Sequence, residues 1–322
     1  MPLVDRASSL PAGISAVVPV YRSETILPQL IPRLTAALEQ LSPAHEIILV
    51  VDGSPDRSWD VVTAAARADA RIRGFRLMRN FGQHNALLLG IRQARYRYTL
   101  TLDDDLQNPP EEIAQLVAAL TDDVDVVYGT PASEQHSIWR SAASRVTKYA
   151  LEEAMGANAA RSVSAFRVFR TELRGAFERY QSPDISVDVL LTWATTRFAT
   201  VKVTQDPRGD GRSTYTFGRL LHHAMNMMTG FTTRPLRVAS LIGFVFTIFG
   251  VVIFFVVVVR NLIQGDAVPG FPFLASIIAI FSGVQLLILG IMGEYVARMH
   301  LRLLERPTYV VAETTKDIEP LP

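Results

Sequence analysis

The sequence predicts an α/β domain with a mostly parallel, three-layer sheet, followed by a hairpin of two transmembrane helices. Short apolar runs rich in β-branched residues alternate with amphipathic segments of helical length in the N-terminal part of the chain. Further along, Arg260 and Asp266 are the only charged residues between Val238 and Gly293, although charged residues make up 20% of the whole chain. A water-soluble part is therefore joined to an apolar part.

Strands and helices are expected in strict alternation along the water-soluble part. The apolar runs predict strands at residues 14–20, 45–51, 74–77, 98–102 and 125–128. Apolar residues at helical spacing predict helices between them, at residues 27–41, 59–70, 85–94 and 111–120. In folds with this order the helices cover both faces of the sheet, and ligands bind at the carboxyl ends of the strands.

Two later stretches are long and apolar enough to cross a membrane. Residues 236–259 contain one charge, Arg237, and residues 271–293 contain none. At about 1.5 Å per residue, each stretch can cross a hydrocarbon core of about 30 Å. Both outer ends are basic, which by the positive-inside tendency places both of them in the cytoplasm. The flanking basic residues are Arg219, Arg234, Arg237, Arg298, Arg302 and Arg306.

The segment that joins the two parts predicts an amphipathic helix at residues 216–235. Its apolar residues fall near one helical face, which suits a helix in the membrane interface, although a helix packed on a protein core has the same pattern. The N-terminal residues lack the apolar core of a signal peptide. We therefore expect a cytosolic domain at 1–215, an interfacial helix at 216–235, a membrane hairpin at 236–293 and a cytosolic tail at 294–322.

Composition and missing motifs exclude several classes of function. The chain has no cysteine, which excludes disulfides, thiolate metal sites and a cysteine nucleophile. Its net charge of +1, without a run of charge that would suggest a polybasic arm, argues against a nucleic-acid partner. No P-loop, dinucleotide-binding, zinc-protease or α/β-hydrolase motif occurs.

Polar, turn-rich clusters follow four of the predicted strands, at residues 19–24, 52–56, 79–84 and 103–111. Each is a weak signal alone, since Asp-Gly-Ser is a common turn and Asn-Pro-Pro-Glu a good helix start. Because parallel strands end at one edge of a sheet, the four clusters together predict one site there.

Three adjacent carboxylates, Asp103, Asp104 and Asp105, carry the chemistry of this edge. They repel one another, so a cation should compensate, and alternation along an extended chain would put Asp103 and Asp105 on the same side. Mg²⁺ or Mn²⁺ prefers oxygen ligands and would suit these carboxylates together with the amide oxygen of Gln107. A solvated acidic loop that caps the next helix would explain the same residues.

Four motifs along the chain match those of a known enzyme family. They are Pro19-x-Tyr21-x-x-Glu24, Asp52-Gly-Ser-x-Asp56, Arg79-Asn-Phe-Gly-Gln-His84 and Asp103-x-Asp105-Leu-Gln-Asn-Pro-Pro-Glu111. With the two C-terminal spans, they resemble the membrane-anchored polyprenyl-phosphate glycosyltransferases of glycosyltransferase family 2. Within that group the chain looks most like the undecaprenyl-phosphate aminoarabinosyl transferases, and it also resembles the dolichol-phosphate mannose synthases, which are their relatives. The resemblance implies a Rossmann-like sheet of the GT-A type and a homo-oligomer.

The resemblance also implies roles on the donor side of the site. The nucleotide sugar, a UDP-sugar by resemblance, would contact Pro19, Tyr21, Glu24, Asp52, Arg79, Gln83, Asp103 and Asp104. Asp105 and Gln107 would hold Mg²⁺ or Mn²⁺ on the donor diphosphate, and Asp103, Asp105 and Arg208 would be the catalytic residues.

On the acceptor side, two motifs are similar to phosphate-binding segments of the family. Arg140-x-x-x-Ser144 is similar to the lipid-phosphate clamp, and Arg208-x-x-Gly211-x-Ser213 to the mobile loop that closes over both phosphates, with Arg212 as its second cation. Four positions depart from the family pattern: Val51, Pro131, Ala165 and Arg212.

Ala165 stands where relatives carry a carboxylate that is often proposed to act near the acceptor. A phosphate monoester has a second pKa near 6, so a polyprenyl phosphate is already a nucleophile and needs no general base. Asp184 and Asp188 are therefore expected to be surface carboxylates.

The implied reaction is inverting sugar transfer to a polyprenyl phosphate at the inner leaflet. Two alternatives stay open. A processive polysaccharide synthase would need many spans and a Q-x-x-R-W motif, which is absent. The second alternative is an inactive membrane scaffold or a nucleotide-sugar-binding partner of a glycan transporter, which would need neither the many spans nor the motif.

Overall fold

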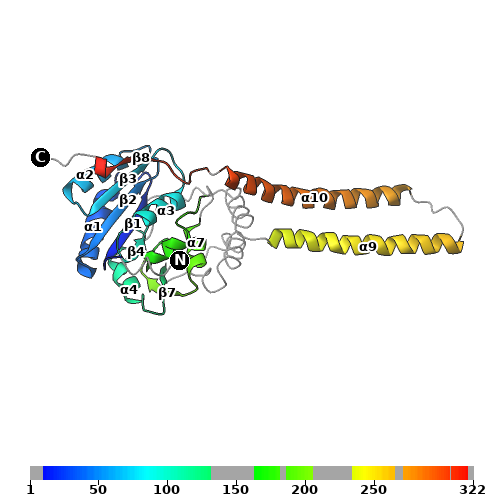
Figure 1. Cartoon of the computed structure of the whole chain (residues 1–322), viewed down its shortest axis with the longest axis horizontal. Coiled ribbons are helices and arrows are strands. Elements are labelled where there is room, and N and C mark those ends of the chain that lie inside the picture. The colour runs from blue at the N-terminus through cyan, green and yellow to red at the C-terminus, as the bar shows by residue number, and fades with distance from the viewer. Residues whose placement is uncertain are drawn as a thin grey trace. The chain divides into compact units, whose positions relative to one another are not determined.

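The computed structural model describes residues 10–131, 163–181, 186–205, 234–264, 271–304 and 306–317. The chain divides into two compact units (Figure 1). One unit combines Met1–Phe217 with Glu305–Pro322, and the other is Gly218–Leu304.

The first unit is built on an eight-stranded sheet with the strand order β7-β5-β6-β4-β1-β2-β3-β8. Its strands are β1 (Ile14–Val20), β2 (His45–Val51), β3 (Ile72–Leu77), β4 (Tyr98–Thr101), β5 (Val126–Pro131), β6 (Arg167–Arg170), β7 (Phe198–Val203) and β8 (Val311–Thr314). All five predicted strands are present, and β1 and β2 have the predicted bounds.

The sheet is mixed rather than mostly parallel. Strand β1 is parallel to β2 and β4, β2 is parallel to β3, and β7 is parallel to β5. Strand β6 runs antiparallel to both β4 and β5, and β8 runs antiparallel to β3. Both reversed strands have four residues and come from parts of the chain where no strand is predicted. The parallel half of the sheet is the part that carries the polar clusters.

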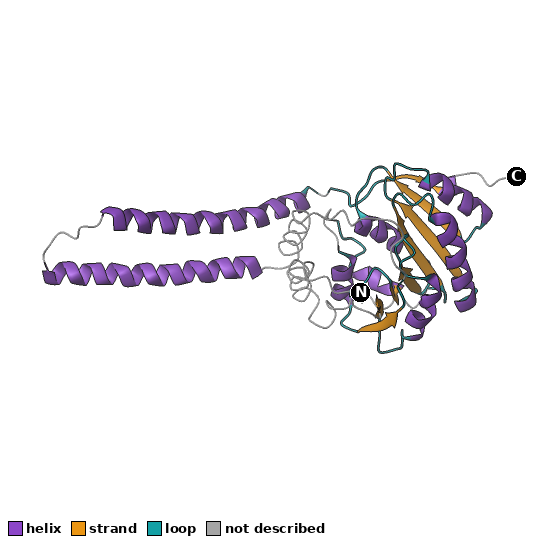
Figure 2. Ribbon diagram, turned by 180° about the vertical axis from the view of Figure 1, so that it is seen from behind, coloured by secondary structure: helices purple, strands orange, loops and turns teal. Residues whose placement is uncertain are grey.

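Helices cover both faces of this sheet, as Figure 2 shows. On one face lie α1 (Leu27–Leu41), α2 (Ser58–Ala68) and α4 (Ile113–Ala118), which share an apolar core with Ala16 and Val18 of β1. On the other face lie α3 (Gln83–Gln93) and α7 (Val187–Ala194), whose core includes the intervening residue, Val17. This alternation along β1 confirms the predicted three-layer α/β fold.

Short 3-10 turns complete the described part of the unit: η2 (Pro110–Glu112) before α4, η3 (Thr171–Ala176) after β6 and η4 (Thr315–Asp317) after β8. The predicted helix at 111–120 is therefore divided between η2 and α4. Its start carries two prolines, Pro109 and Pro110, which fix the backbone for a first turn but supply no N–H group.

The second unit contains two long apolar helices, α9 (Arg234–Gln264) and α10 (Phe271–Leu303). They pack against each other, with the rings of Phe246 and Phe281 in an edge-to-face contact at 5.8 Å. In α9 the stretch Val238–Val256 is long and apolar enough to cross a membrane, and α10 contains the shorter apolar stretch Phe281–Ala297.

The segment after α10 is not a free tail. It returns to the first unit and forms β8, which pairs with β3 at the edge of the sheet. Several contacts fasten it there: the indole of Trp59 donates to Glu313 at 2.8 Å, and the Gly74 N–H donates to the Thr315 hydroxyl at 2.9 Å. This strand is not predicted from the sequence, because four residues are too short a pattern to indicate a strand.

Candidate active site

Asp104 joins the loop after β1 to the loop after β4. Its Oδ2 atom accepts a hydrogen bond from the Tyr21 N–H at 3.0 Å and another from the Ser23 hydroxyl. Burial raises the pKa of Asp104, the nearby charge of Asp105 raises it further, and the two hydrogen bonds oppose this shift. Because β1 and β4 are parallel neighbours, the two loops leave the sheet at the same edge.

Asp52 does the same for the loops after β2 and β3. Its carboxylate accepts the Phe81 N–H at 2.7 Å and the Gly82 N–H at 2.8 Å, and its pKa is raised by burial against the effect of these bonds. The next residue, Gly53, has a φ of +58°, and a Cβ there would lie 2.2 Å from the carbonyl carbon of Arg79. The close approach of the two loops thus requires glycine at this position.

A third link runs from α3 to the acidic loop. The side-chain amide of Gln83, the first residue of α3, donates to Asp103 Oδ1 at 2.5 Å. Nearby, the Arg79 guanidinium lies over the ring of Phe81 at 4.5 Å. Through these bonds the structure brings the four polar clusters to one edge of the sheet.

Glu24 and Asp56 connect the loop after β1 to the loop after β2. Asp56 accepts hydrogen bonds from the Glu24 N–H at 3.1 Å and from the hydroxyls of Ser54 and Ser58 at 2.6 and 2.7 Å. Burial opposes the shift, but these bonds together lower the pKa of Asp56. The Glu24 carboxylate in turn accepts the Arg57 N–H at 2.8 Å. Tyr21 is 43% exposed at this edge, whereas Pro19 is buried within β1.

The acidic loop differs from its predicted shape. Strand β4 ends at Thr101, the chain turns at Asp104 and Asp105, and Leu106 has a φ of +58°. The prediction that Asp103 and Asp105 share one side of an extended chain is therefore wrong. Instead, Asp105 Oδ1 accepts the Gln107 N–H at 3.1 Å, so that both predicted metal ligands belong to one tight turn.

The donor atoms of this loop fit a hard divalent cation. Asp103, Asp105 and Gln107 offer carboxylate and amide oxygens, and all three residues are half-buried. Among the residues that the structure describes, no three His, Asp or Glu side chains are grouped closely enough to enclose a metal ion. Mg²⁺ and Mn²⁺ are commonly held by one or two carboxylates together with substrate phosphates, and Asp103 and Asp105 offer two such carboxylates.

A buried polar cluster behind this loop was missed by the sequence analysis. Arg167 is 1% exposed and forms an ion pair with Asp188, which also accepts the Tyr128 hydroxyl at 3.0 Å. Arg167 Nε donates to the hydroxyl of Thr101, two residues before Asp103, at 2.9 Å. Asp188 is 5% exposed, so its expected place on the surface is wrong. Its position in the apolar run Val187–Ala194 was the signal that it is buried.

Several predicted residues lie outside the described part of the chain. They are Asp184, the proposed interfacial helix up to residue 233, and the acceptor-side residues Arg140, Ser144, Arg208, Arg212 and Ser213. The structure therefore bears on the donor side of the site.

Comparison with known families identifies the family to which this chain belongs. The model of the family described as glycosyl transferase family 2 matches residues 15–176, which include all four polar clusters. The chain belongs to glycosyltransferase family 2. This confirms the resemblance inferred from the motifs.

Relatives that align with nearly the whole transferase are named for one activity. Proteins named undecaprenyl-phosphate 4-deoxy-4-formamido-L-arabinose transferase from several bacteria are similar to it. The relative from Aeromonas hydrophila is 34% identical, over 94% of each chain. That from Yersinia pestis is 35% identical, over 95% of this chain and 97% of its own. That from Pseudomonas aeruginosa is 35% identical, over 94% and 90%. The transferase is thus a homologue of polyprenyl-phosphate sugar transferases.

Solved structures share its fold. A mycobacterial protein of 18% identity superposes with a TM-score of 0.51, over 70% of this chain and 75% of the other. Glucosyl-3-phosphoglycerate synthase from Mycobacterium tuberculosis, in complex with Mn²⁺ and UDP-glucose, gives 0.50 at 14% identity, over 71% and 81%. The transferase therefore has a GT-A-like mixed sheet.

Proposed function

We propose that this transferase moves a sugar from a nucleotide-diphosphate donor, a UDP-sugar, to undecaprenyl phosphate with inversion at the anomeric carbon. The observation that carries the proposal is the meeting of four family-matched loops at one sheet edge, where Gln83 donates to Asp103 and the Tyr21 N–H donates to Asp104. Relatives named for transfer to undecaprenyl phosphate align over nearly the whole chain, which supports the acceptor.

On the donor side, Asp52 and Asp104 hold the loops in place and Tyr21, Glu24, Arg79 and Gln83 border the nucleotide. Asp105 and Gln107 would hold Mg²⁺ or Mn²⁺, which when bound neutralises charge on the donor diphosphate. The Mn²⁺ complex of the structurally similar synthase is in keeping with this choice of ion.

The reaction needs a nucleophile, a leaving group and control of negative charge. An oxygen of the lipid phosphate attacks the anomeric carbon, and the bond from this carbon to the donor phosphate breaks. The bonding electron pair leaves with the nucleoside diphosphate. Because the phosphate monoester is largely dianionic at neutral pH, no side chain has to remove a proton. Repulsion between two anionic reactants is then the main obstacle, and Arg140, Arg208 and Arg212, with Ser144 and Ser213, are proposed to reduce it.

We place the transferase in the inner membrane, with α9 and α10 as two spans. Strand β8 follows α10 and pairs with β3 of the catalytic sheet, so the chain returns to the side of the membrane from which it left. A single crossing would put β3 and β8 on opposite sides, and hence the number of crossings must be even. Basic residues outside both spans support a cytoplasmic position of the sheet.

The substitution Asp105→Ala tests the site. It removes a proposed metal ligand, and we expect metal-dependent sugar transfer to fall at least about a hundredfold. Asp60→Ala is the matched control, since it removes an exposed carboxylate of α2 whose partner is Arg57. Transfer is measured with purified protein in nanodiscs that contain undecaprenyl phosphate, and an unchanged Tm shows that the fold is intact. Full activity of Asp105→Ala would refute the assignment.

A further inference from the structure

A cavity lies at the end of the sheet opposite the active site. Its volume is about 310 Å³, and it borders Ile72 and Arg73 at the start of β3, whereas the polar clusters follow the strands' other ends. The remaining lining residues come from α2 and the residues after it, from the loop before β4, and from η4: Thr63, Ala66, Arg67, Ala70, Arg95, Thr315 and Lys316.

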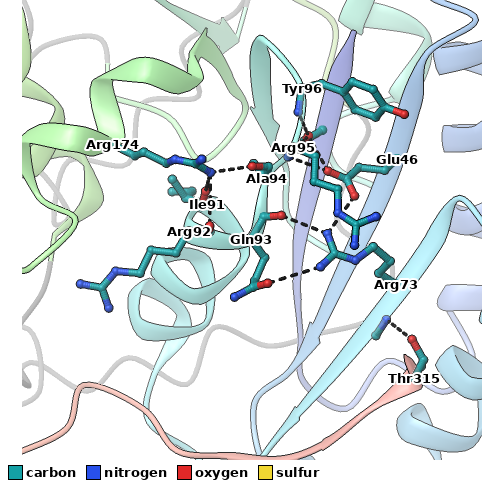
Figure 3. A network of polar contacts seen from close by, with 12 residues as sticks. Glu46, Arg73, Ile91, Arg92, Gln93, Ala94, Arg95, Tyr96, Arg174 and Thr315 are labelled. Carbon is teal, nitrogen blue, oxygen red and sulfur yellow. Dashed lines mark hydrogen bonds and ion pairs between the residues drawn. The ribbon is translucent and has the colours of Figure 1, made fainter. Parts of the chain in front are cut away.

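The lining is strongly basic. Among the described residues that line the cavity, Arg67, Arg73, Arg95 and Lys316 are cationic and none is acidic. Glu46 lies behind the wall and forms an ion pair with Arg73 at 2.9 Å, which balances one of these charges. Figure 3 shows Arg73 between Glu46 and Gln93, with the side chain of Arg95 beside it.

Another cavity of similar size provides a comparison. It has a volume of about 380 Å³ and lies between α1 and α4. Its one cation, Arg33, is paired with Glu111 through two hydrogen bonds of 2.8 and 2.9 Å. The basic lining therefore distinguishes the cavity beside β3 and η4 from the cavity beside α1.

The wall of the basic cavity also contains unsatisfied polar atoms. The hydroxyl oxygen of Thr63 and Nε of Arg73 are shielded from solvent, and neither has a hydrogen-bond partner among the described residues. Arg73 as a whole is 7% exposed. Buried polar atoms without a partner cost free energy, so the described protein groups alone do not satisfy this wall.

We propose that this cavity binds a phosphate-bearing anion at a site separate from the active site. Arginine and lysine side chains from separate elements are the groups that bind phosphate oxygens in proteins. The volume is at the lower limit for ligand pockets, which favours a small anion such as phosphate, pyrophosphate or the phosphodiester of a lipid headgroup over a nucleotide sugar.

Because of the position of Lys316, a bound anion would also hold the segment after α10 in place. Lys316 belongs to the segment that returns after α10, whereas Arg67 and Arg73 belong to α2 and β3. An anion bound by all three holds the returning segment on the sheet. Binding to the form in which this segment lies on the sheet stabilises that form, by a free energy that rises with the logarithm of the ligand concentration above the Kd.

The test uses the full-length protein in nanodiscs, with EDTA present to remove divalent metal. In one arm, pyrophosphate is titrated into phosphatidylcholine nanodiscs and its Kd is measured by calorimetry. In the other arm, Tm is compared between nanodiscs with and without phosphatidylglycerol. The variants are Arg67→Ala, Arg95→Ala and Lys316→Ala, and Arg33→Ala is the control because it removes the same charge from the other cavity.

We expect saturable binding of pyrophosphate that each cavity variant weakens at least about tenfold, while Arg33→Ala binds like the unaltered protein. A rise in Tm with phosphatidylglycerol alone, lost in the same three variants, would identify the ligand as a lipid phosphodiester. Absence of a cavity-dependent effect in both arms, including binding that survives in all three variants, would overturn the proposal.

Discussion

Asp52 and Asp104 each hold two loops of the active site together, while Asp103 and Asp105 border the same edge. The carboxylates of Asp52 and Asp104 accept hydrogen bonds from backbone N–H groups at 2.7 to 3.0 Å. Burial raises the pKa of both. At the residue scale, acids in adjacent positions therefore have different tasks. Asp104 turns back to Tyr21 and Ser23, whereas Asp105 turns to the backbone of Gln107.

The substitution Asp104→Asn tests the raised pKa. The pKa of Asp104 in the folded protein lies above its value of 3.8 in a model compound, so its stabilising effect is complete below that pH and is lost as the pH rises through the folded-state pKa. An asparagine oxygen can accept the same two hydrogen bonds without ionising. We expect the Tm of the variant, relative to the unaltered protein, to rise from pH 4 to pH 7. A difference in Tm that is constant with pH would contradict this.

A second prediction concerns the buried pair Arg167 and Asp188. Removing one partner leaves a buried charge without compensation, and Asp188→Ala should lower the free energy of unfolding by about 3–5 kcal/mol. Asp60→Ala breaks an exposed pair and should cost less than about 1 kcal/mol. Urea unfolding of both variants measures the difference, and equal effects would show that the Arg167 pair does not contribute as a buried charge pair.

At the element scale, α3 connects the two ends of the sheet. Its first residue, Gln83, reaches Asp103, and its last carbonyl groups accept hydrogen bonds from arginines (Figure 3). Arg174 donates to the carbonyl oxygens of Ile91, Arg92 and Ala94, and Arg73 donates to that of Gln93. Cations at the carboxyl end of a helix satisfy its unpaired carbonyls and its dipole.

The close packing of α3 on β1 gives the third prediction. A Cβ at Gly90 would lie 2.2 Å from Cγ1 of Val17 in the middle of the sheet. Gly90→Ala should therefore push α3 outward, at a cost of about 1–3 kcal/mol, and should reduce transfer by displacing Gln83. Gly283→Ala in α10 is the control, since a Cβ there would meet no atom of the described residues within 4 Å apart from its chain neighbours and the nearby backbone of its own helix. A Gly90→Ala protein with unchanged Tm would refute this packing argument.

The elements that periodicity reveals were predicted from the sequence, and those that depend on distant pairing were not. Strands β1 and β2 and helix α1 have their predicted bounds because long apolar patterns define them. Strand β6 contains Arg167 and Arg170, and its place between β4 and β5 depends on burying an arginine beside Asp188. Similarly, the meeting of the four loops follows from strand order, but the turn at Asp104 depends on Ser23, which is distant in sequence.

At the scale of the whole molecule, the chain leaves the catalytic sheet, passes through α9 and α10, and returns as β8. This connection predicts where each segment lies relative to the membrane. Because the chain has no cysteine, single cysteines can be introduced without background labelling.

We expect Gln40→Cys and Pro307→Cys to react with a membrane-impermeant maleimide from the cytoplasmic side, and Gln264→Cys to react from the opposite side. Gln40 and Pro307 are exposed in the catalytic unit, and Gln264 ends α9. Labelling in sealed vesicles of both orientations measures this. If Gln40→Cys and Pro307→Cys reacted from opposite sides, two crossings would be excluded.

The most direct test of the proposed activity is mass spectrometry of the lipid formed in nanodiscs that contain undecaprenyl phosphate. The purified transferase is supplied with a panel of UDP-sugars and with Mg²⁺ or Mn²⁺. We predict that one donor yields undecaprenyl phosphate carrying a single added sugar, and that this product disappears with EDTA and with Asp105→Ala. If the unaltered protein bound a donor yet formed no glycosylated lipid with any sugar of the panel, it would be a scaffold and not the proposed transferase.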